Sequence, residues 1–302
     1  MFKFRPQAFA TLRTGLVHTK PARAAAVVSR RSGKEPRLLH AVSQGRVSGV
    51  LSWRATQSML ETLPAKSGNV SALLDSSDYQ IVMTEGLDLP RHELRAAMRW
   101  RIRELVSFPV DDAVIDVFQM PAIRGNKNLF QVVAAQPTGI NDLEAIVGGA
   151  RRELDVVDIP ELALRNLMAL TPQDTSGCAL ILLGRSAVHI VVTCQGVLCV
   201  ARRIDFALGS ESGQLALELQ RSMQYYESQF DRPPIGEVLI GPDNDRAREL
   251  APQIAAATGL NSSVLDIRSF LPCEPGIDYL NEPEVVLAIG AALRPSALGA
   301  GA

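Results

Sequence analysis

The chain has 302 residues, of which 47% are hydrophobic and 21% are charged, and this length is enough for roughly two domains with their own cores. Such a composition excludes a single small module and a chain that is disordered over most of its length. The formal charge of −1 hides an asymmetry: residues 1–40 carry nine basic side chains and one acid, net +8, and the rest carries 22 bases and 31 acids, net −9. A basic segment of this kind is typical of a solvated edge, or of a surface that faces anionic lipid, nucleic acid or an acidic partner.

The first 171 residues predict a repeated order of strands and helices, from apolar β-branched runs and from apolar residues at helical spacing. The expected strands are 12–18, 23–28, 38–42, 70–74, 130–135 and 156–159, and the expected helices are 51–62, 140–154 and 161–170. Asp158, with Glu161 three positions later, predicts a capping box at the start of the last helix. Gly148 and Gly149 interrupt a helical pattern, so we expect another helix to pack closely there, or as the alternative a ligand to approach the backbone.

An extra piece interrupts this order between residues 74 and 130. It predicts a strand at 81–83, a helix at 91–106 and a strand at 114–120, which together make a small β-α-β subdomain. The helix has one apolar face, which we expect to be buried, formed by Leu94, Ala97, Met98, Ile102 and Leu105.

Basic residues recur at every fourth position of the same helix. They are Arg91, Arg95, Arg99 and Arg103. At this spacing their guanidinium groups line one ridge, and we expect their charges to be uncompensated. Such a ridge is typical of a solvated face or of a surface that meets an acidic partner or lipid phosphate, and Trp100 is either a core residue or an interface anchor.

The second half of the chain predicts the same order of elements as the first. The expected strands are 179–184, 187–194, 197–206, 237–240 and 263–267, and the expected helices are 215–230 and 245–258. Gly259 is expected to end the second of these helices. A last helix begins at Asn281, with Glu284 predicted to complete a capping box, and the residues after Arg294 are expected to form a loose tail.

The second half therefore has the order β-β-β-α-β-α-β-α, and the first half can be interpreted in the same way with the extra piece inserted. This repeat predicts an α/β protein of two similar lobes that face a cleft. The predicted units are a first lobe of residues 1–77 and 126–171, an inserted subdomain of residues 78–125, a second lobe of residues 172–295 and a tail of residues 296–302.

Several kinds of segment and site are not predicted. The most apolar stretch, 178–201, is interrupted by Arg185 and His189, so no membrane span is expected, and the N-terminus lacks a signal-peptide core, so we expect the cytoplasm. His189, Cys194 and Cys199 are evenly spaced but fall in Val-rich runs, where cysteine behaves as a small buried apolar residue, so we expect no metal site.

No catalytic motif is recognised. Residues 31–34 (RSGK) lack the spacing of a phosphate-binding loop and predict a hairpin turn, and residues 209–213 place Glu211 where an esterase nucleophile would stand. The four histidines, at positions 18, 40, 92 and 189, have no partner spacing for a metal or a triad.

Four segments carry a family resemblance. Residues 94–116 (LRAAMRWRIRELVSFPVDDAVID), 153–166 (ELDVVDIPELALRN) and 287–294 (LAIGAALR) resemble the PilM family of type IV pilus assembly proteins. Residues 217–229 (LELQRSMQYYESQ) agree with its MshI branch, named for the mannose-sensitive hemagglutinin (MSHA) pilus. The resemblance implies an actin-like fold of two ribonuclease-H-like lobes, with the inserted piece as the family's extra subdomain.

The resemblance also implies a location and a partner. Proteins similar to PilM sit on the cytoplasmic face of the inner membrane, and they hold the short cytoplasmic N-terminus of a PilN-like membrane protein in a groove beside the inserted subdomain. We therefore expect a PilN-like partner, other pilus platform components and peripheral membrane association, but no nucleic acid. The residues assigned to partner binding are Arg91, Arg95, Arg99, Trp100 and Arg103.

The nucleotide loops that the resemblance implies are degenerate. The first falls near Val17, the second reads Leu182-Leu183-Gly184 without an aspartate, and the adenosine loop reads Gly241-Pro242-Asp243. Without carboxylates nothing holds Mg²⁺, and Pro242 removes a backbone donor. We expect a scaffold without catalysis, cofactor or metal, a pseudo-ATPase.

Two alternatives stay open. One is an actin-like ATPase or nucleotide-binding enzyme, for which Asp158, Asp205 and Asp243 are the candidate acidic residues and ATP the ligand. The other is the cytoplasmic lobe pair of a type II secretion platform protein, a relative that normally continues into a transmembrane helix.

Overall fold

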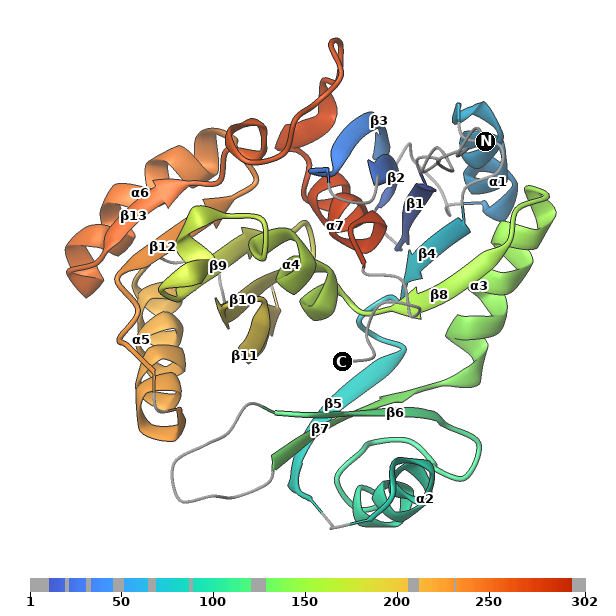
Figure 1. The fold of residues 1–302 in the computed structure, drawn as a ribbon, viewed down its shortest axis with the longest axis horizontal. Coiled ribbons are helices and arrows are strands. Elements are labelled where there is room, and N and C mark those ends of the chain that lie inside the picture. The colour runs from blue at the N-terminus through green and yellow to red at the C-terminus, as the bar shows by residue number, and fades with distance from the viewer. Residues whose placement is uncertain are drawn as a thin grey trace, which may run out of the picture.

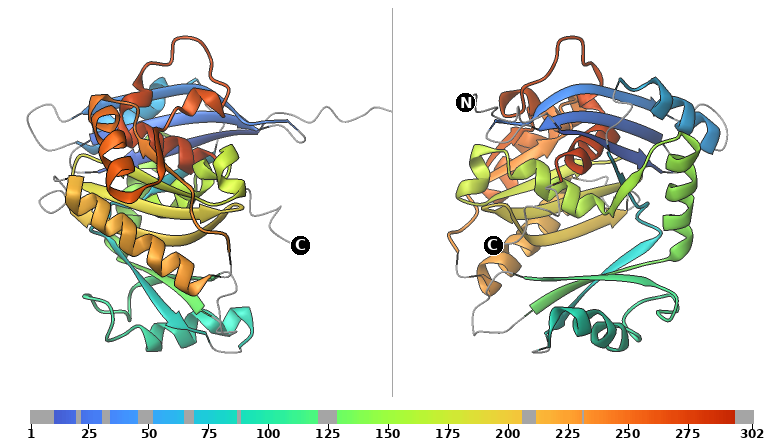
Figure 2. Two further views of the ribbon diagram at one scale, coloured as in Figure 1. Left: turned by 90° about the vertical axis from the view of Figure 1, so that its left-hand side faces the viewer. Right: turned by 45° about the vertical axis from the view of Figure 1, so that its right-hand side comes forward.

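The computed structural model describes residues 11–19, 22–30, 34–45, 52–64, 69–86, 89–120, 129–205, 212–230 and 232–294. Two five-stranded sheets and one three-stranded sheet form the framework, and helices pack on each of them (Figures 1 and 2). Within these residues no helix combines the length and the apolar character that a membrane span requires.

The two larger sheets have the same topology. The first has the order β3-β2-β1-β4-β8 and the second the order β11-β10-β9-β12-β13. In each, three antiparallel strands are followed by two strands added in parallel on the other side of the first. The strands are β1 (Thr11–His18), β2 (Ala22–Arg30), β3 (Arg37–Gly45), β4 (Asn69–Leu73), β8 (Leu154–Asp158), β9 (Cys178–Leu183), β10 (Ala187–Cys194), β11 (Val197–Asp205), β12 (Glu237–Gly241) and β13 (Asn261–Val264). This repeat confirms the predicted pair of similar lobes.

Six helices cover these two sheets. They are α1 (Trp53–Thr62), α3 (Pro137–Gly149), α4 (Pro160–Met168), α5 (Ser212–Gln229), α6 (Asp245–Thr258) and α7 (Pro283–Ala292). Helices α1 and α3 pack on the outer face of the first sheet, and α5 and α6 on the outer face of the second. Helices α4 and α7 lie between the two sheets and share one core with both (Figure 1). Every residue of α7 is buried, as expected of a helix that is apolar on all sides.

Glycine allows α7 to approach its neighbours closely. A Cβ atom on Gly290 would lie 2.6 Å from the carbonyl carbon of Ala163 in α4, and a Cβ on Gly15 in β1 would lie 2.8 Å from the carbonyl carbon of Ala288. Only a residue without a side chain fits at these two positions. The prediction for α3 is half right: a Cβ on Gly149 would meet the Gln57 side chain of α1, but Gly148 faces open space.

The inserted subdomain is a three-stranded sheet with the order β5-β7-β6, formed by β5 (Tyr79–Glu85), β6 (Val114–Gln119) and β7 (Leu129–Ala135). The strand predicted at 130–135 is its central strand, and not part of the first lobe's sheet, because it pairs with β5 and β6 on its two sides. Apolar spacing predicts a strand but not its neighbours. The residue boundaries expected for the two lobes, the inserted subdomain and the tail remain a prediction.

Helix α2 (Arg91–Arg101) covers one face of the inserted sheet, where Leu94, Met98 and Ile102 pack against β7. The helix ends five residues before the predicted residue 106. Beyond Arg101 the backbone tightens, with a bond from the Leu105 N–H to the Ile102 carbonyl. Leu105 is therefore 59% exposed, and its predicted burial is wrong.

Two predicted capping boxes are wrong, because tertiary partners take their carboxylates. At α4 the N-cap is Ile159, Asp158 pairs with Arg294, and Glu161 accepts from the Tyr79 hydroxyl. At α7 the N-cap is Glu282 and not Asn281, and Glu284 pairs with Arg185. Helix α6 ends as predicted, with Gly259 in the left-handed conformation at φ 75°.

Candidate functional site

A small interlobe cavity lies where the two large sheets meet the start of α7. Its volume is about 50 Å³, whereas sites for small-molecule ligands measure roughly 300–1,000 Å³. Of the five positions assigned to degenerate nucleotide loops, Val17, Leu182 and Gly184 line this cavity. The other two, Gly241 and Pro242, follow β12 and are not among the residues that line it.

An arginine from the β9–β10 hairpin occupies the position where a phosphate loop is expected. The Arg185 guanidinium pairs with Glu282 and, through Nε, with Glu284 at 3.2 Å. Burial raises the pKa of Glu284, and the nearby Arg185 charge opposes that rise. The cation at this hairpin is therefore already neutralised within the chain.

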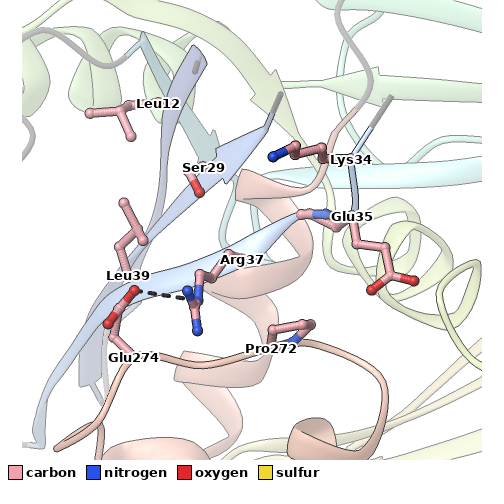
Figure 3. Close-up of a pocket in the computed structure, with 9 residues that line it drawn as sticks. Leu12, Ser29, Lys34, Glu35, Arg37, Leu39, Pro272 and Glu274 are labelled. Atoms are coloured by element: carbon pink, nitrogen blue, oxygen red, sulfur yellow. Dashed lines mark ion pairs between the residues drawn. The ribbon is translucent and has the colours of Figure 1, made fainter. Parts of the chain in front are cut away.

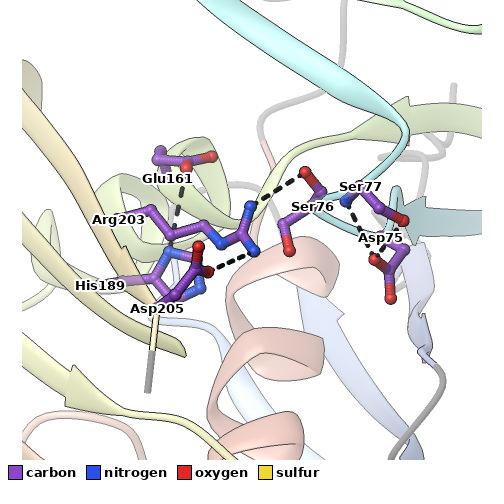
Figure 4. Close-up of polar contacts among 7 residues, drawn as sticks. All are labelled: Asp75, Ser76, Ser77, Glu161, His189, Arg203 and Asp205. Atoms are coloured by element: carbon purple, nitrogen blue, oxygen red, sulfur yellow. Dashed lines mark hydrogen bonds and ion pairs between the residues drawn. The ribbon is translucent and has the colours of Figure 1, made fainter. Parts of the chain in front are cut away.

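Polar contacts beside the cavity join the two lobes (Figure 4), and a further contact reaches the inserted subdomain. The Tyr79 hydroxyl at the start of β5 donates to Glu161 Oε2 on α4 at 2.7 Å, and Glu161 Oε1 lies 3.8 Å from His189 Nδ1 on β10. Arg203 on β11 donates to the Ser76 carbonyl at 3.1 Å. Burial lowers the pKa of His189 and, together with Glu161, raises that of Tyr79. Burial thus favours the neutral rings of His189 and Tyr79, and the contacts tie the two lobes and the inserted subdomain together.

The three candidate acids for an ATPase lie outside this cavity. Asp158 pairs with Arg294 at 2.6 Å, Asp205 with Arg203 at 2.7 Å, and Asp243 with Arg248 at 2.8 Å. None of the three lines the cavity.

The sequence reasoning missed Asp75, which lines the interlobe cavity and accepts from the backbone N–H and hydroxyl of Ser77 at 3.0 and 2.8 Å. Its place after a central strand is the signal that could have found it. Within the described ranges no group of three His, Cys, Asp or Glu residues is placed to hold a metal ion.

A second concave surface, here named the insertion groove, runs between the inserted sheet and the first lobe and has a volume of about 110 Å³. One wall is the face of the inserted sheet that is turned away from α2, and the other is formed by β8, α3 and α4. Its lining is mostly apolar and consists of Leu74, Val114, Asp116, Phe118, Val133, Ala135, Ile140, Val157, Asp158, Ile159, Leu162 and Arg294. Both β6 and β8 are edge strands of their sheets.

The arginine ridge of α2 is not uncompensated, which corrects the sequence prediction. Arg95 pairs with Asp116 at 2.8 Å, and Asp116 belongs to the wall of the insertion groove. Arg99 donates to the carbonyls of Asp111 and Ala113 at 3.1 and 2.9 Å, and also to that of Val110. The acids follow 8 to 21 residues later in the chain, beyond the range of helical spacing rules. The side chain of Arg91 lies outside the described residues.

The last ridge residue, Arg103, follows the end of α2 and lies close to Trp100. Arg103 pairs with Asp111 at 3.4 Å, and its guanidinium carbon lies 5.5 Å from the centre of the Trp100 ring. Trp100 is 75% exposed, so it is not a core residue.

Four basic residues of the N-terminal segment are also engaged within the fold. Arg13 pairs with Asp155 at 3.3 Å and Arg37 with Glu274 at 3.3 Å. Arg23 donates to Gln44, and Arg30 to the Leu293 carbonyl. These contacts give four of the nine cations a structural role. Lys3, Arg5, Lys20 and Arg31, and most of the predicted RSGK turn, lie outside the described residues.

No family model and no curated protein sequence matches the chain. Among solved structures, the PilM-PilN type IV pilus biogenesis complex aligns with a TM-score of 0.72 and 19% identity, over 95% of this chain and 100% of that one. The cytoplasmic domain of EpsL, an inner-membrane component of the type II secretion system of Vibrio cholerae, aligns with a TM-score of 0.54 and 12% identity. That alignment covers 97% of this chain and 99% of the EpsL domain. A Bacteroides thetaiotaomicron protein with an actin-like ATPase fold aligns with a TM-score of 0.53 and 9% identity, over 93% of this chain and 96% of that one. The chain therefore has the actin-like α/β fold that the sequence resemblance implied.

Proposed function

We propose that this protein is a non-catalytic scaffold of a type IV pilus machine, and that its insertion groove holds the cytoplasmic N-terminus of a PilN-like inner-membrane protein. The observation that carries the proposal is the groove itself, an apolar channel between two edge strands, β6 and β8. The solved PilM structure with a similar fold is a complex with PilN, and this supports the choice of partner.

Edge strands explain how such a segment would be held. An extended peptide can pair its backbone with the free edge of β6 or β8, and alternate side chains then enter the apolar lining. Phe118 and Val133 from the inserted sheet and Leu162 from α4 supply that lining. The expected ligand is therefore an extended segment with apolar residues at alternate positions.

The arginine ridge takes a different part in this proposal from the direct contact first assigned to it. Arg95 holds Asp116 on β6, and Arg99 holds the carbonyls of the loop that leads into β6. Both residues thereby position one wall of the groove. Replacing either is expected to weaken docking by moving β6 rather than by removing a contact with the peptide.

The absence of catalysis is part of the proposal. Three features support it: the interlobe cavity is smaller than a nucleotide, Arg185 is neutralised by Glu282 and Glu284, and Asp158, Asp205 and Asp243 are paired elsewhere. One observation favours the alternative of an ATPase, namely the Asp75 carboxylate that lines the cavity. A thermal-shift titration with Mg-ATP separates the two, because a ligand at 100 times its Kd stabilises a protein by about 2.7 kcal/mol.

The proposed machine is an MSHA-like pilus, on the resemblance of residues 217–229 to the MshI branch. Docking of a short membrane-anchored segment would place the protein in the cytoplasm, peripherally at the inner membrane, beside other platform components. The partners are proteins, and no nucleic acid is proposed.

A binding assay tests the proposal. A fluorescently labelled peptide of the PilN-like cytoplasmic N-terminus is titrated with the wild type, and a saturable rise in anisotropy is expected. Val114→Arg places a long cation at the rim of the groove and should abolish binding, while the matched control Leu105→Arg, on the same subdomain but outside the groove, should bind as the wild type. Equal binding by both variants would contradict the groove assignment.

A further inference from the structure

An exposed tryptophan lies at the end of α2, a helix on the face of the inserted sheet that is turned away from the insertion groove. Trp100 is the most exposed of the large apolar side chains in the described ranges. Arg103 lies over one face of its ring. The neighbouring Arg101 is exposed and forms no hydrogen bond or ion pair with another described residue. Trp100, Arg101 and Arg103 are named here the Trp100 patch. Tryptophan and arginine are the residues most enriched at the energetic centres of protein interfaces.

A hollow of about 610 Å³ lies beside β3, and no residue of the interlobe cavity or the groove belongs to it. It is lined by Leu12, Ser29, Lys34, Glu35, Pro36, Arg37, Leu39, Pro272 and Glu274. In Figure 3 the Leu12 and Leu39 side chains stand on one side and Lys34 on the other, with the Arg37–Glu274 pair below them. This surface is named the β3 hollow.

The chemistry of the β3 hollow suits an indole ring with a basic neighbour. Leu12 and Leu39 offer an apolar wall, and the Lys34 and Arg37 cations are of the kind that stacks on an aromatic face. The Glu35 and Glu274 carboxylates can accept from an indole N–H or an arginine. Glu35 is exposed and has no hydrogen bond or ion pair with another described residue, which matches the free charge of Arg101.

We propose that the Trp100 patch of one copy docks into the β3 hollow of a second copy of this chain. Helix α2 and strand β3 lie at opposite ends of the molecule in all three views of Figures 1 and 2, so one chain cannot make the contact with itself. Because the two surfaces differ, the contact is head-to-tail, and it produces rings or open chains rather than a closed dimer. The proposal goes beyond the scaffold function and does not depend on it, since the insertion groove stays free.

Sedimentation velocity of the full chain tests the contact. A patch of three residues gives a weak interface, so the protein is measured at concentrations between about 5 and 200 µM. We expect the wild-type sedimentation coefficient to rise with concentration. Trp100→Ala should weaken association by about 30-fold, as loss of a central interface residue does. The control Trp53→Ala, which removes the other tryptophan on α1, should leave association unchanged. A wild type that stays monomeric throughout, or equal losses in both variants, overturns the proposal.

Two further measurements test the contact: an exchange of charges, which involves neither tryptophan, and a mixture of two variants. Arg101→Glu and Glu35→Arg should each weaken association, and the double variant should restore it, since neither change breaks an ion pair within the described residues. Ser29→Arg fills the β3 hollow, so Ser29→Arg and Trp100→Ala should each be monomeric alone and form a 1:1 dimer when mixed. No restoration in the double variant, or a mixture that stays monomeric, overturns the head-to-tail contact.

Discussion

Replacing Gly290 by alanine tests the packing of the helix pair at the centre of the molecule. The added Cβ would lie 2.6 Å from the Ala163 carbonyl carbon and 3.2 Å from the Ala163 Cα. Both neighbours are backbone atoms, so α4 and α7 must move apart. Overpacking of this kind costs about 1–3 kcal/mol and more where backbone must move, while alanine regains about 1 kcal/mol of helix propensity. With the cost at the upper end of this range, because backbone atoms block the Cβ, we expect a net loss of about 2 kcal/mol in the free energy of unfolding.

Gly148→Ala is the matched control, because this glycine also lies in a helix but a Cβ there meets no atom within 4 Å. The same substitution should stabilise the protein by up to about 1 kcal/mol. Urea denaturation measures both effects as shifts of the midpoint at constant slope. If Gly290→Ala were as stable as the wild type, the close approach of α4 and α7 would be wrong.

Three other predictions concern buried polar and sulfur groups. Tyr79→Phe leaves a buried carboxylate without its donor and should cost about 2 kcal/mol, whereas Tyr279→Phe, on an exposed ring, should cost nothing measurable by urea midpoint. Burial lowers the pKa of His189 below 6.5, against the opposing Glu161 charge and with the help of Arg203. As the pH is lowered, the unfolded chain therefore takes up the proton before the folded chain does. The free energy of unfolding should decrease below about pH 6.5, by up to about 1.4 kcal/mol per pH unit, and it should decrease less in His189→Gln. Equal pH profiles of the wild type and this variant would contradict the prediction. Burial raises the pKa of Cys178 to about 12, so a thiol reagent at pH 8 should find only the half-buried Cys273 in the native protein and all four thiols in urea; rapid reaction of more than one native thiol would show that the core is open.

The sequence predicted the lobes well because their elements have clear local periods. The runs that became β9, β10 and β11 are separated by short turn signals, and the apolar face of α5 recurs at helical spacing. The place of strand β7 was not predictable from its local pattern. Its apolar pattern is that of a buried strand in any sheet, and only the pairing with β5 and β6 places it in the inserted subdomain.

The sites were harder to predict because their residues come together only in the folded chain. The ridge on α2 looked unpaired, since Asp116 follows Arg95 by 21 residues and reaches it through β6. Arg185 and Glu284 are 99 residues apart and close the interlobe cavity. The insertion groove needs two sheet edges whose strands are separated by a helix and another strand, and no local pattern reports such a meeting.

Hydrogen exchange on the full chain, with and without the PilN-like N-terminal peptide, tests the central claim most directly. Pairing with a sheet edge protects backbone amides, so the peptide should slow exchange in β6 or β8, at residues 114–119 or 154–158. Mg-ATP should leave the hairpins at residues 17–19 and 182–187 unchanged. Protection of those hairpins by Mg-ATP, with no effect of the peptide on β6 or β8, would contradict the account and favour a nucleotide-binding protein.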